Sequence, residues 1–367
     1  MSGDDRRWML RALRLASLAA GTTWPNPGVG CVIVRDGAVL GEGFTAAFVA
    51  EKSREHGEAA ALRQCRERAL TVTGATAYVT LAPCTKRSAA AGEACSLALR
   101  TAGVARVVIA VADPNQSDSV EHLTAHGVQV DTGVCAAEAE HLHGGFLSRI
   151  TAKRPRFTGK WAMTLDGCLA AHTGASGWIS SPEALALSRR RRRAFDAILI
   201  GGGTAKADDP QLLASRPRTR NAMSGPLRIV VSSGADLSDE SRLLHSLDQA
   251  PLLVVHGVGA DPSRLRTWGA EAQALDDPHD ANQLARMLGG WGLNDVLVEG
   301  GAAIHGAFLR AGLYDRLEVY QGATTLGGGL PIARGTGVPA IPDGQHWHPE
   351  TAPRLLGTTI LTRWTRA

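Results

Sequence analysis

Three residues that bind soft divalent metals, His56, Cys84 and Cys95, lie in the first third of the 367-residue sequence, and Glu58 lies close to the first of them. One imidazole and two thiolates suit Zn²⁺, and three protein ligands leave a fourth position for water, as in catalytic zinc sites. Zinc lowers the pKa of a bound water to about 7. Glu58 can take the proton of that water and pass it to a leaving amine. These residues therefore predict a zinc-dependent hydrolytic deaminase site.

The order of these residues adds to the prediction. His-x-Glu followed by Pro-Cys is typical of zinc deaminases that act on bases, which usually continue as Cys-x-x-Cys. Here ten residues separate Cys84 from Cys95. The alternative is that His56 is an ordinary surface histidine and that the cysteines fill the core as small apolar residues. The combination of all four residues in this order favours the metal site.

A second group of candidate residues lies in the later half of the sequence, next to glycine turns. Lys160 lies in an expected strand, the segment 201–204 (Gly-Gly-Gly-Thr) follows another, and Glu299-Gly300-Gly301 ends a third. Glycine lets a ligand approach the backbone, and a helix that starts there offers free N–H groups to a phosphate. Neither junction matches the dinucleotide fingerprint or the P-loop. Glycine turns that serve packing alone are the alternative for each.

Five consecutive arginines occupy positions 189–193. Such a run can be a solvated helix face, a patch for nucleic acid, or a source of one phosphate-binding arginine beside a cofactor. Five positions cover more than one helical turn, so only one or two side chains can face a common ligand. The rest of the chain is not basic, so we expect one functional arginine and no nucleic-acid partner.

The elements that must position these residues follow from the hydrophobic pattern, which alternates strands with helices and so predicts the α/β class. In the first half, strands are expected at 29–34, 38–43, 76–81, 106–111 and 128–130, and helices at 5–20, 56–69, 92–102 and 119–126. In the second half, strands are expected at 157–164, 197–200, 227–231, 252–255, 296–299 and 317–321, and helices at 182–195, 281–288 and 303–311. A basic segment with a proline at 149–156 is expected to link two domains.

Composition excludes several classes of protein. With 44 % hydrophobic and 20 % charged residues, the chain is an ordinary globular protein and not a disordered one. A net charge of +4 is too weak alone to indicate nucleic acid or an anionic membrane. No apolar run reaches the roughly 18 residues of a membrane span. The N-terminus does not have the pattern of a secretory signal, and six sparse cysteines favour free or metal-bound thiols in a reducing cytoplasm.

In this order the motifs resemble those of the bifunctional riboflavin-biosynthesis deaminase-reductase family, over nearly the whole chain. The deaminase-like motifs are Pro25-Asn26-Pro27, His56-Gly57-Glu58, Pro83-Cys84 and Cys95. The reductase-like motifs are Thr164-Leu165-Asp166-Gly167, Trp178-Ile179-Ser180, Gly203-Thr204, Asp208-Asp209-Pro210 and Glu299-Gly300-Gly301.

The resemblance implies two domains: a cytidine-deaminase-like α/β/α sandwich at residues 1–146 and a dihydrofolate-reductase-like α/β domain at residues 147–367. It implies zinc-dependent deamination of 2,5-diamino-6-(5-phosphoribosylamino)pyrimidin-4-one, followed by NADPH-dependent reduction of its ribosyl group to ribityl. The expected partner is thus a small phosphorylated pyrimidine. A homo-oligomer, either a dimer or a tetramer, is also expected, with no membrane partner and in the cytoplasm.

The resemblance also implies roles for single residues. His56, Cys84 and Cys95 would hold zinc, and Glu58 would move protons. The residues implied for NADPH are Ala162, Trp178, Thr204, Asp208 and Gly301. Those implied for substrate are Asn26, Ser176, Arg192, Leu212, Arg216 and Glu299, with Lys160 near the reacting carbon.

Several positions depart from the family pattern. The family usually has alanine where this chain has Gly57, and glutamate where it has Ala82. The arginine expected for the substrate phosphate falls at Ser215, with Arg216 beside it. Most departures fall on the deaminase half. An alternative is therefore a paralogue in a specialised pathway to a pteridine or azapteridine antibiotic, with one half altered or inactive.

Overall fold

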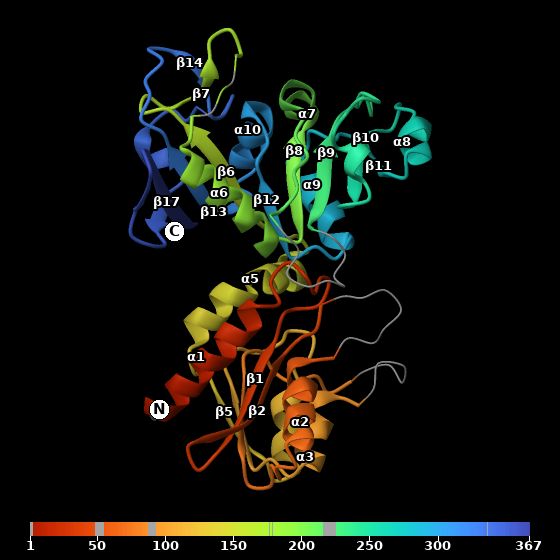
Figure 1. Ribbon diagram of the computed structural model, residues 1–367, viewed down its shortest axis with the longest axis vertical. Helices are drawn as coiled ribbons and strands as arrows, with labels where there is room; N and C mark the ends of the chain where they lie inside the picture. Colours follow the sequence, from red (N-terminus) through yellow and green to blue (C-terminus); the bar gives the residue numbers. More distant parts are fainter. Residues whose placement is uncertain are drawn as a thin grey trace. The chain divides into compact units, whose positions relative to one another are not determined.

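A computed structural model describes residues 3–47, 55–86, 93–175, 177, 179–215, 225–335 and 337–367. Within these residues the chain separates into two compact units, the first ending at Lys153 and the second starting at Arg154 (Figure 1). No helix in the described ranges is both long enough and apolar enough to cross a bilayer.

The first unit contains a five-stranded sheet in the order β2-β1-β3-β4-β5. Its strands are β1 Gly30–Arg35, β2 Ala38–Phe44, β3 Thr76–Val79, β4 Arg106–Ile109 and β5 Gln129–Thr132. Its helices are α1 Gly3–Ser17, α2 Gly57–Glu67, α3 Cys95–Thr101, α4 Ser119–Thr124 and α5 Ala136–Ala152. β2 and β3 run antiparallel to β1, whereas β3, β4 and β5 are parallel. The carboxyl ends of β3 and β4 therefore share one edge.

Helices cover both faces of this sheet. Successive side chains of a strand point to opposite faces. Cys31 and Ile33 of β1 pack in a core with α2 and α3, and Val32 and Val34 pack in a second core with α1 and α5. Because both faces are apolar, β1 is buried along nearly its whole length. The unit is thus a three-layer α/β/α sandwich, as the sequence resemblance implied.

The second unit is built on a ten-stranded sheet in the order β11-β10-β9-β8-β12-β6-β13-β17-β15, with β16 also paired to β17. Its parallel strands are β6 Arg156–Met163, β8 Ala197–Gly201, β9 Leu227–Val231, β10 Leu252–Gly257, β11 Glu271–Leu275, β12 Asp295–Val298 and β13 Tyr314–Gln321. The antiparallel strands at the other end are β15 Trp347–Pro349, β16 Arg354–Leu356 and β17 Thr359–Arg366. A separate pair joins β7 Cys168–Ala171 to β14 Gly329–Pro331.

The helices of the second unit connect these strands. They are α6 Pro182–Arg191, α7 Gly202–Asp208, α8 Ser263–Thr267, α9 Ala281–Gly290 and α10 Ala302–Arg310, with 3-10 turns η2 Arg192–Ala194, η3 Leu244–Ser246 and η4 Ile341–Asp343. Because β8, β12, β6 and β13 are adjacent and parallel, their carboxyl ends meet at one edge of the sheet. The glycine junctions at 201–204 and 299–301 both lie at this edge.

The expected linker at 149–156 was wrong in its first part. α5 continues to Ala152, and β6 already begins at Arg156. Glycine disfavours helix, and the pair Gly144-Gly145 hid this helix from the sequence pattern. Gly145 is buried in α5 beside Phe146, so packing outweighs the poor helix propensity at this point.

Candidate active sites

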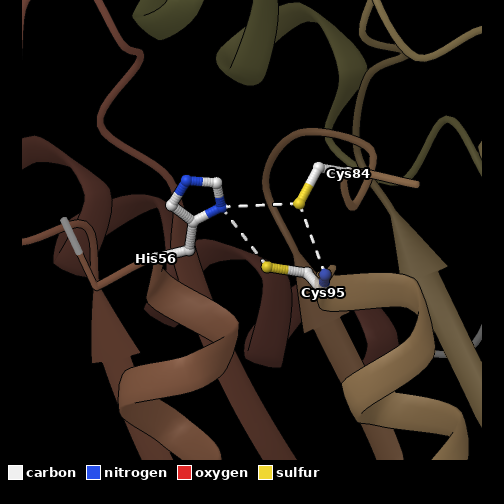
Figure 2. Close-up of side chains that lie close together, drawn as sticks. All are labelled: His56, Cys84 and Cys95. Carbon is white, nitrogen blue, oxygen red and sulfur yellow. Dashed lines mark hydrogen bonds between the residues drawn. The ribbon is translucent and has the colours of Figure 1, made fainter. Parts of the chain in front are cut away.

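The three expected metal ligands converge in the first unit. His56 Nδ1 lies 3.6 Å from Cys84 Sγ and 3.3 Å from Cys95 Sγ. All three ligand atoms lie within 4.8 Å of one another. Figure 2 shows the imidazole and both thiols turned toward a common point.

The donor set fits zinc. For Zn–N near 2.0 Å and Zn–S near 2.3 Å, tetrahedral geometry places a ligand nitrogen and sulfur about 3.5 Å apart. The measured N···S distances of 3.3 and 3.6 Å match this edge. Hydrogen bonding with Cys95 lowers the pKa of the Cys84 thiol, and the same contact raises the pKa of Cys95. Cys84 is therefore the first of the two thiols to ionise.

The fold explains why the long interval between the cysteines does not separate them. Cys84 follows β3 at the carboxyl edge of the sheet, and Cys95 is the first residue of α3. The backbone N–H of Cys95 donates to Cys84 Sγ at 3.3 Å, and that of Ser96 donates to the Cys84 carbonyl at 3.1 Å. The start of α3 is thus held directly against Cys84, whatever the length of the intervening loop.

Glu58 lies in the first turn of α2, next to the ligands. Its side chain is buried, and its Oε2 has no hydrogen-bond partner within the described ranges. Burial raises the pKa of Glu58, although His56 nearby opposes the shift, and its carboxyl also interacts with Cys95. A buried carboxyl oxygen without a partner is costly. Its position beside three ligand atoms suits a group that hydrogen-bonds a water or a substrate.

Gly57 is required by a close approach of two elements. A Cβ at this position would lie 2.5 Å from the carbonyl oxygen of Val29 and 3.3 Å from the Cα of Phe44. The start of α2 therefore rests against β1 and β2 with no room for a side chain. Glycine here does more than loosen the helix start, since it fixes where His56 and Glu58 stand.

Two further residues of the first unit bear on this site, one expected from the sequence and one not. Asn26, expected near the pyrimidine, is half-buried in the turn before β1, and its N–H donates to the Thr23 carbonyl. Asp113, which the sequence did not single out, follows β4; burial raises its pKa, and Cys84 nearby raises it further. Asp113 could have been found from the sequence, because it follows β4, which runs parallel to β3, the strand that precedes Cys84.

In the second unit, three expected residues form one charged cluster. Arg192 donates two hydrogen bonds of 2.8 Å to the Glu299 carboxylate, and Lys160 Nζ lies 3.9 Å from Glu299 Oε2. The Glu299 side chain is 7 % exposed. Burial opposes its ionisation, but Arg192 and Lys160 outweigh this effect and lower the pKa of Glu299 to about 2. Glu299 is therefore ionised at neutral pH.

Arg192 and its neighbour explain the arginine run. Arg191 donates to the buried Glu318, while Arg189 and Arg190 are exposed. Two of the five side chains thus reach buried carboxylates.

The two glycine junctions pack against each other. A Cβ at Gly300 would lie 2.8 Å from the Cα of Ile200, and a Cβ at Gly301 would lie 2.7 Å from Thr204 Oγ1. Gly301 has a φ of 46°, which favours glycine. The expected NADPH residues Thr204 and Gly301 are thereby brought together.

A cavity of about 800 Å³ opens beside these junctions. It is lined by residues 201–203, by Ala303 and Ile304 at the start of α10, and by the loop after β9. A cavity of this size fits a dinucleotide. Because the helix α10 begins at its wall, free backbone N–H groups can face a pyrophosphate there. The residues present therefore fit NADPH.

The cavity also includes residues that sequence reasoning missed. Ser232, Ser233 and His279 line it, and Ser233 Oγ lies 2.7 Å from His279 Nε2. The sequence feature that could have indicated them is the Ser-Ser-Gly segment directly after β9, because it lies at the same carboxyl edge of the sheet as the glycine junctions. Asp208, expected at the cofactor, is exposed at the end of α7, whereas the adjacent Asp209 is the residue that lines the cavity.

The remaining expected residues divide into three groups. Ala162 is half-buried on β6, two residues after Lys160. Leu212 has a φ of 52°, and its side chain is buried in the hydrophobic core, so only its backbone is available to a ligand. Ser176, Trp178 and Arg216 lie outside the described residues.

Comparisons with known proteins identify the domain family of each unit. Residues 155–354 match the family described as RibD C-terminal domain. Residues 2–111 match the cytidine and deoxycytidylate deaminase zinc-binding region. The first unit is thus cytidine-deaminase-like, and the second carries the reductase domain.

Curated relatives match along most of the chain. The riboflavin biosynthesis protein RibD of Aquifex aeolicus is 34 % identical over 332 residues, 89 % of each chain. That of Escherichia coli is 36 % identical over 341 residues, 88 % of this chain and 89 % of the relative. That of Mycobacterium tuberculosis strain H37Rv is 37 % identical over 335 residues, 89 % and 87 % of the two chains.

Solved structures agree over the full length. A diaminohydroxyphosphoribosylaminopyrimidine deaminase/5-amino-6-(5-phosphoribosylamino)uracil reductase from Thermotoga maritima has a TM-score of 0.85 and 28 % identity, covering 99 % of both chains. Acinetobacter baumannii RibD, form 1, has a TM-score of 0.86 and 30 % identity with the same coverage. These matches support riboflavin biosynthesis and give no support to the specialised-pathway alternative.

Proposed function

Because the chain belongs to the RibD family of bifunctional riboflavin-biosynthesis enzymes, we propose that its two units act in turn on one phosphorylated pyrimidine. The first unit would hydrolyse an amino group of 2,5-diamino-6-(5-phosphoribosylamino)pyrimidin-4-one and release ammonia. The second would reduce the ribosyl group of the resulting aminouracil to ribityl with NADPH. The domains proposed for these activities are residues 1–146 and 147–367.

In the deaminase step, His56, Cys84 and Cys95 would hold the zinc ion. Zinc supplies a Lewis acid that makes water nucleophilic at neutral pH. Glu58 takes a proton from the attacking water on its unpartnered oxygen and returns a proton to the leaving amine. Its burial supports this role, because burial raises the pKa of the Glu58 carboxyl and so makes it a better proton acceptor. Asn26 is proposed to contact the pyrimidine.

In the reductase step, Gly301 and Thr204 would hold NADPH at the paired glycine junctions, and Ala162, Trp178 and Asp208 are proposed as further NADPH contacts. NADPH supplies the hydride for the ribosyl carbon. Lys160 Nζ stands beside Glu299 and donates the proton that completes the reduction. The remaining proposed substrate contacts are Ser176, Arg192, Leu212 and Arg216.

The wider context of the protein is also part of the proposal. We assign it to the cytoplasm, because its six cysteines, all among the described residues, form no disulfide, and free or metal-bound thiols persist in a reducing compartment. A dimer or tetramer is proposed from the family resemblance. No nucleic-acid partner is proposed, since two arginines of the basic run are committed to buried carboxylates.

The convergence of His56, Cys84 and Cys95 beside Glu58 is the observation that carries the deaminase half. Purified protein should contain about one zinc per chain, by elemental analysis, and should release ammonia from the diaminopyrimidine. With the aminouracil as substrate it should oxidise NADPH, measured at the NADPH absorbance band. Zinc-free protein without ammonia release would refute the first half, and absence of NADPH turnover would refute the second.

A further inference from the structure

The chain has three tyrosines, and all three are buried. The hydroxyl of Tyr78 donates to Asp5 at 2.9 Å, and that of Tyr314 lies 2.6 Å from His305 Nδ1. The hydroxyl of Tyr320 is equally buried, but it has no hydrogen-bond partner in the described part of the chain. Because buried hydroxyls are normally paired, the Tyr320 hydroxyl requires an explanation.

Tyr320 lies on the same face of the sheet as the charged cluster of the second unit. In the parallel pair of β13 with β6, Glu318 is opposite Lys160 and Tyr320 is opposite Ala162. Side chains two apart on a strand share a face, so all four point to one side. Lys160 Nζ lies 5.5 Å from the centre of the Tyr320 ring. Figure 1 shows α6 running across β6 and β13, and Ala184 of this helix packs with Tyr320.

The carboxylates near Tyr320 are already engaged. Glu299 accepts two hydrogen bonds from Arg192, and Glu318 accepts hydrogen bonds from Arg191. Burial raises the pKa of Tyr320, and Glu318 adds to this shift while Arg191 opposes it. The phenol is therefore protonated at neutral pH and available as a donor among ionised groups that do not bind it.

An unsatisfied buried hydroxyl lowers the stability of a fold, and a functional role is one explanation for keeping such a group. We propose that the Tyr320 hydroxyl hydrogen-bonds a hydroxyl of the ribosyl group of the reductase substrate. A phenol both donates and accepts, as a sugar hydroxyl does, and Lys160 lies against its ring. This inference rests on the proposed reductase function and adds a substrate-binding residue to it.

The test compares two tyrosine-to-phenylalanine variants on the same strand. Tyr320→Phe removes the unpartnered hydroxyl, so the thermal midpoint Tm should stay the same or rise. The KM for 5-amino-6-(5-phosphoribosylamino)uracil should rise by about tenfold, the effect of one lost hydrogen bond to a ligand. The dissociation constant of NADPH, measured by fluorescence titration, should not change. Tyr314→Phe is the control: it leaves His305 without its partner, so Tm should fall while the KM stays at the wild-type value.

The outcomes separate this inference from the proposed function. If wild-type protein reduces the aminouracil and Tyr320→Phe has the same KM and kcat, the inference is wrong and the reductase assignment stands. A lower Tm with unchanged kinetics would mean that the hydroxyl serves packing, which also overturns it. A weaker NADPH affinity would place the hydroxyl at the cofactor and contradict the ribosyl contact. Failure of the wild-type protein itself to oxidise NADPH would overturn the reductase proposal.

Discussion

Glu58 is the residue to which we assign proton transfer in the deaminase step. It is fully enclosed at the start of α2, one of its oxygens is unpaired among described residues, and it stands next to three ligand atoms. We expect Glu58→Gln to keep about one zinc per chain, because the variant retains all three ligands. Deamination should fall by about 10²–10⁴-fold, the usual contribution of general acid–base catalysis.

The Glu58→Gln variant carries its own control, since NADPH-dependent reduction by the second unit should be unchanged. Ammonia release, NADPH oxidation and zinc content should be measured on one preparation. Loss of both activities in a folded variant would contradict the assignment of the two reactions to separate units.

At the scale of elements, the junction of α2 with β1 gives the next prediction. Gly57→Ala restores the residue usual in the family, but its Cβ would meet the Val29 carbonyl at 2.5 Å. The start of α2 must then shift, and His56 and Glu58 shift with it. We expect zinc content and deamination to fall and the Tm to drop by several degrees. Gly290→Ala in α9 is a matched control, because its Cβ would meet nothing within 4 Å, and it should be neutral. A fully active Gly57→Ala would show that the junction tolerates a side chain.

The start of β8 gives a prediction on pH. Asp196 is buried, and its Oδ2 accepts the N–H groups of Asn294 and Asp295. Burial and the charge of Asp295 raise the pKa of Asp196 to about 7. Because the folded pKa is above the unfolded value of about 4, the protonated form stabilises the fold at low pH. This contribution, up to about 4 kcal/mol, is present below about pH 4 and is lost progressively as pH rises from about 4 to about 7.

Asp196→Asn should remove that dependence while its amide oxygen keeps both hydrogen bonds. Urea unfolding at pH 5 and pH 8 should show that the variant loses less stability than wild type between the two values. Equal losses in both proteins would show that Asp196 does not titrate in this range.

At the scale of the whole molecule, each set of proposed catalytic residues lies inside one compact unit. Removal of zinc with a chelator should therefore abolish ammonia release and leave NADPH oxidation intact. Adding zinc back should restore deamination. A parallel loss of NADPH oxidation, with no unfolding seen by circular dichroism, would mean that the two units depend on each other.

Residues with distinctive chemistry, such as metal ligands, could be grouped from the sequence. Features that depend on packing in the fold could not be predicted from it. His56, Cys84 and Cys95 could be grouped because few roles other than metal binding unite such residues beside a glutamate. α5 was missed because Gly144-Gly145 breaks its pattern, although burial of Gly145 allows the helix. Ser233 and His279 come from loops more than 40 residues apart in the sequence, and only the fold brings them to one cavity.

The backbone contact between Gly300 and Ile200 has a consequence for how the cofactor arrives. The ends of β12 and β8 are in main-chain contact here. We therefore expect the glycine junctions not to open or close when NADPH binds, and these two strand ends to keep the same geometry with and without the dinucleotide. Binding of NADPH should resemble rigid-body docking. We expect fast association, little loss of conformational entropy in the polypeptide and no lag before hydride transfer.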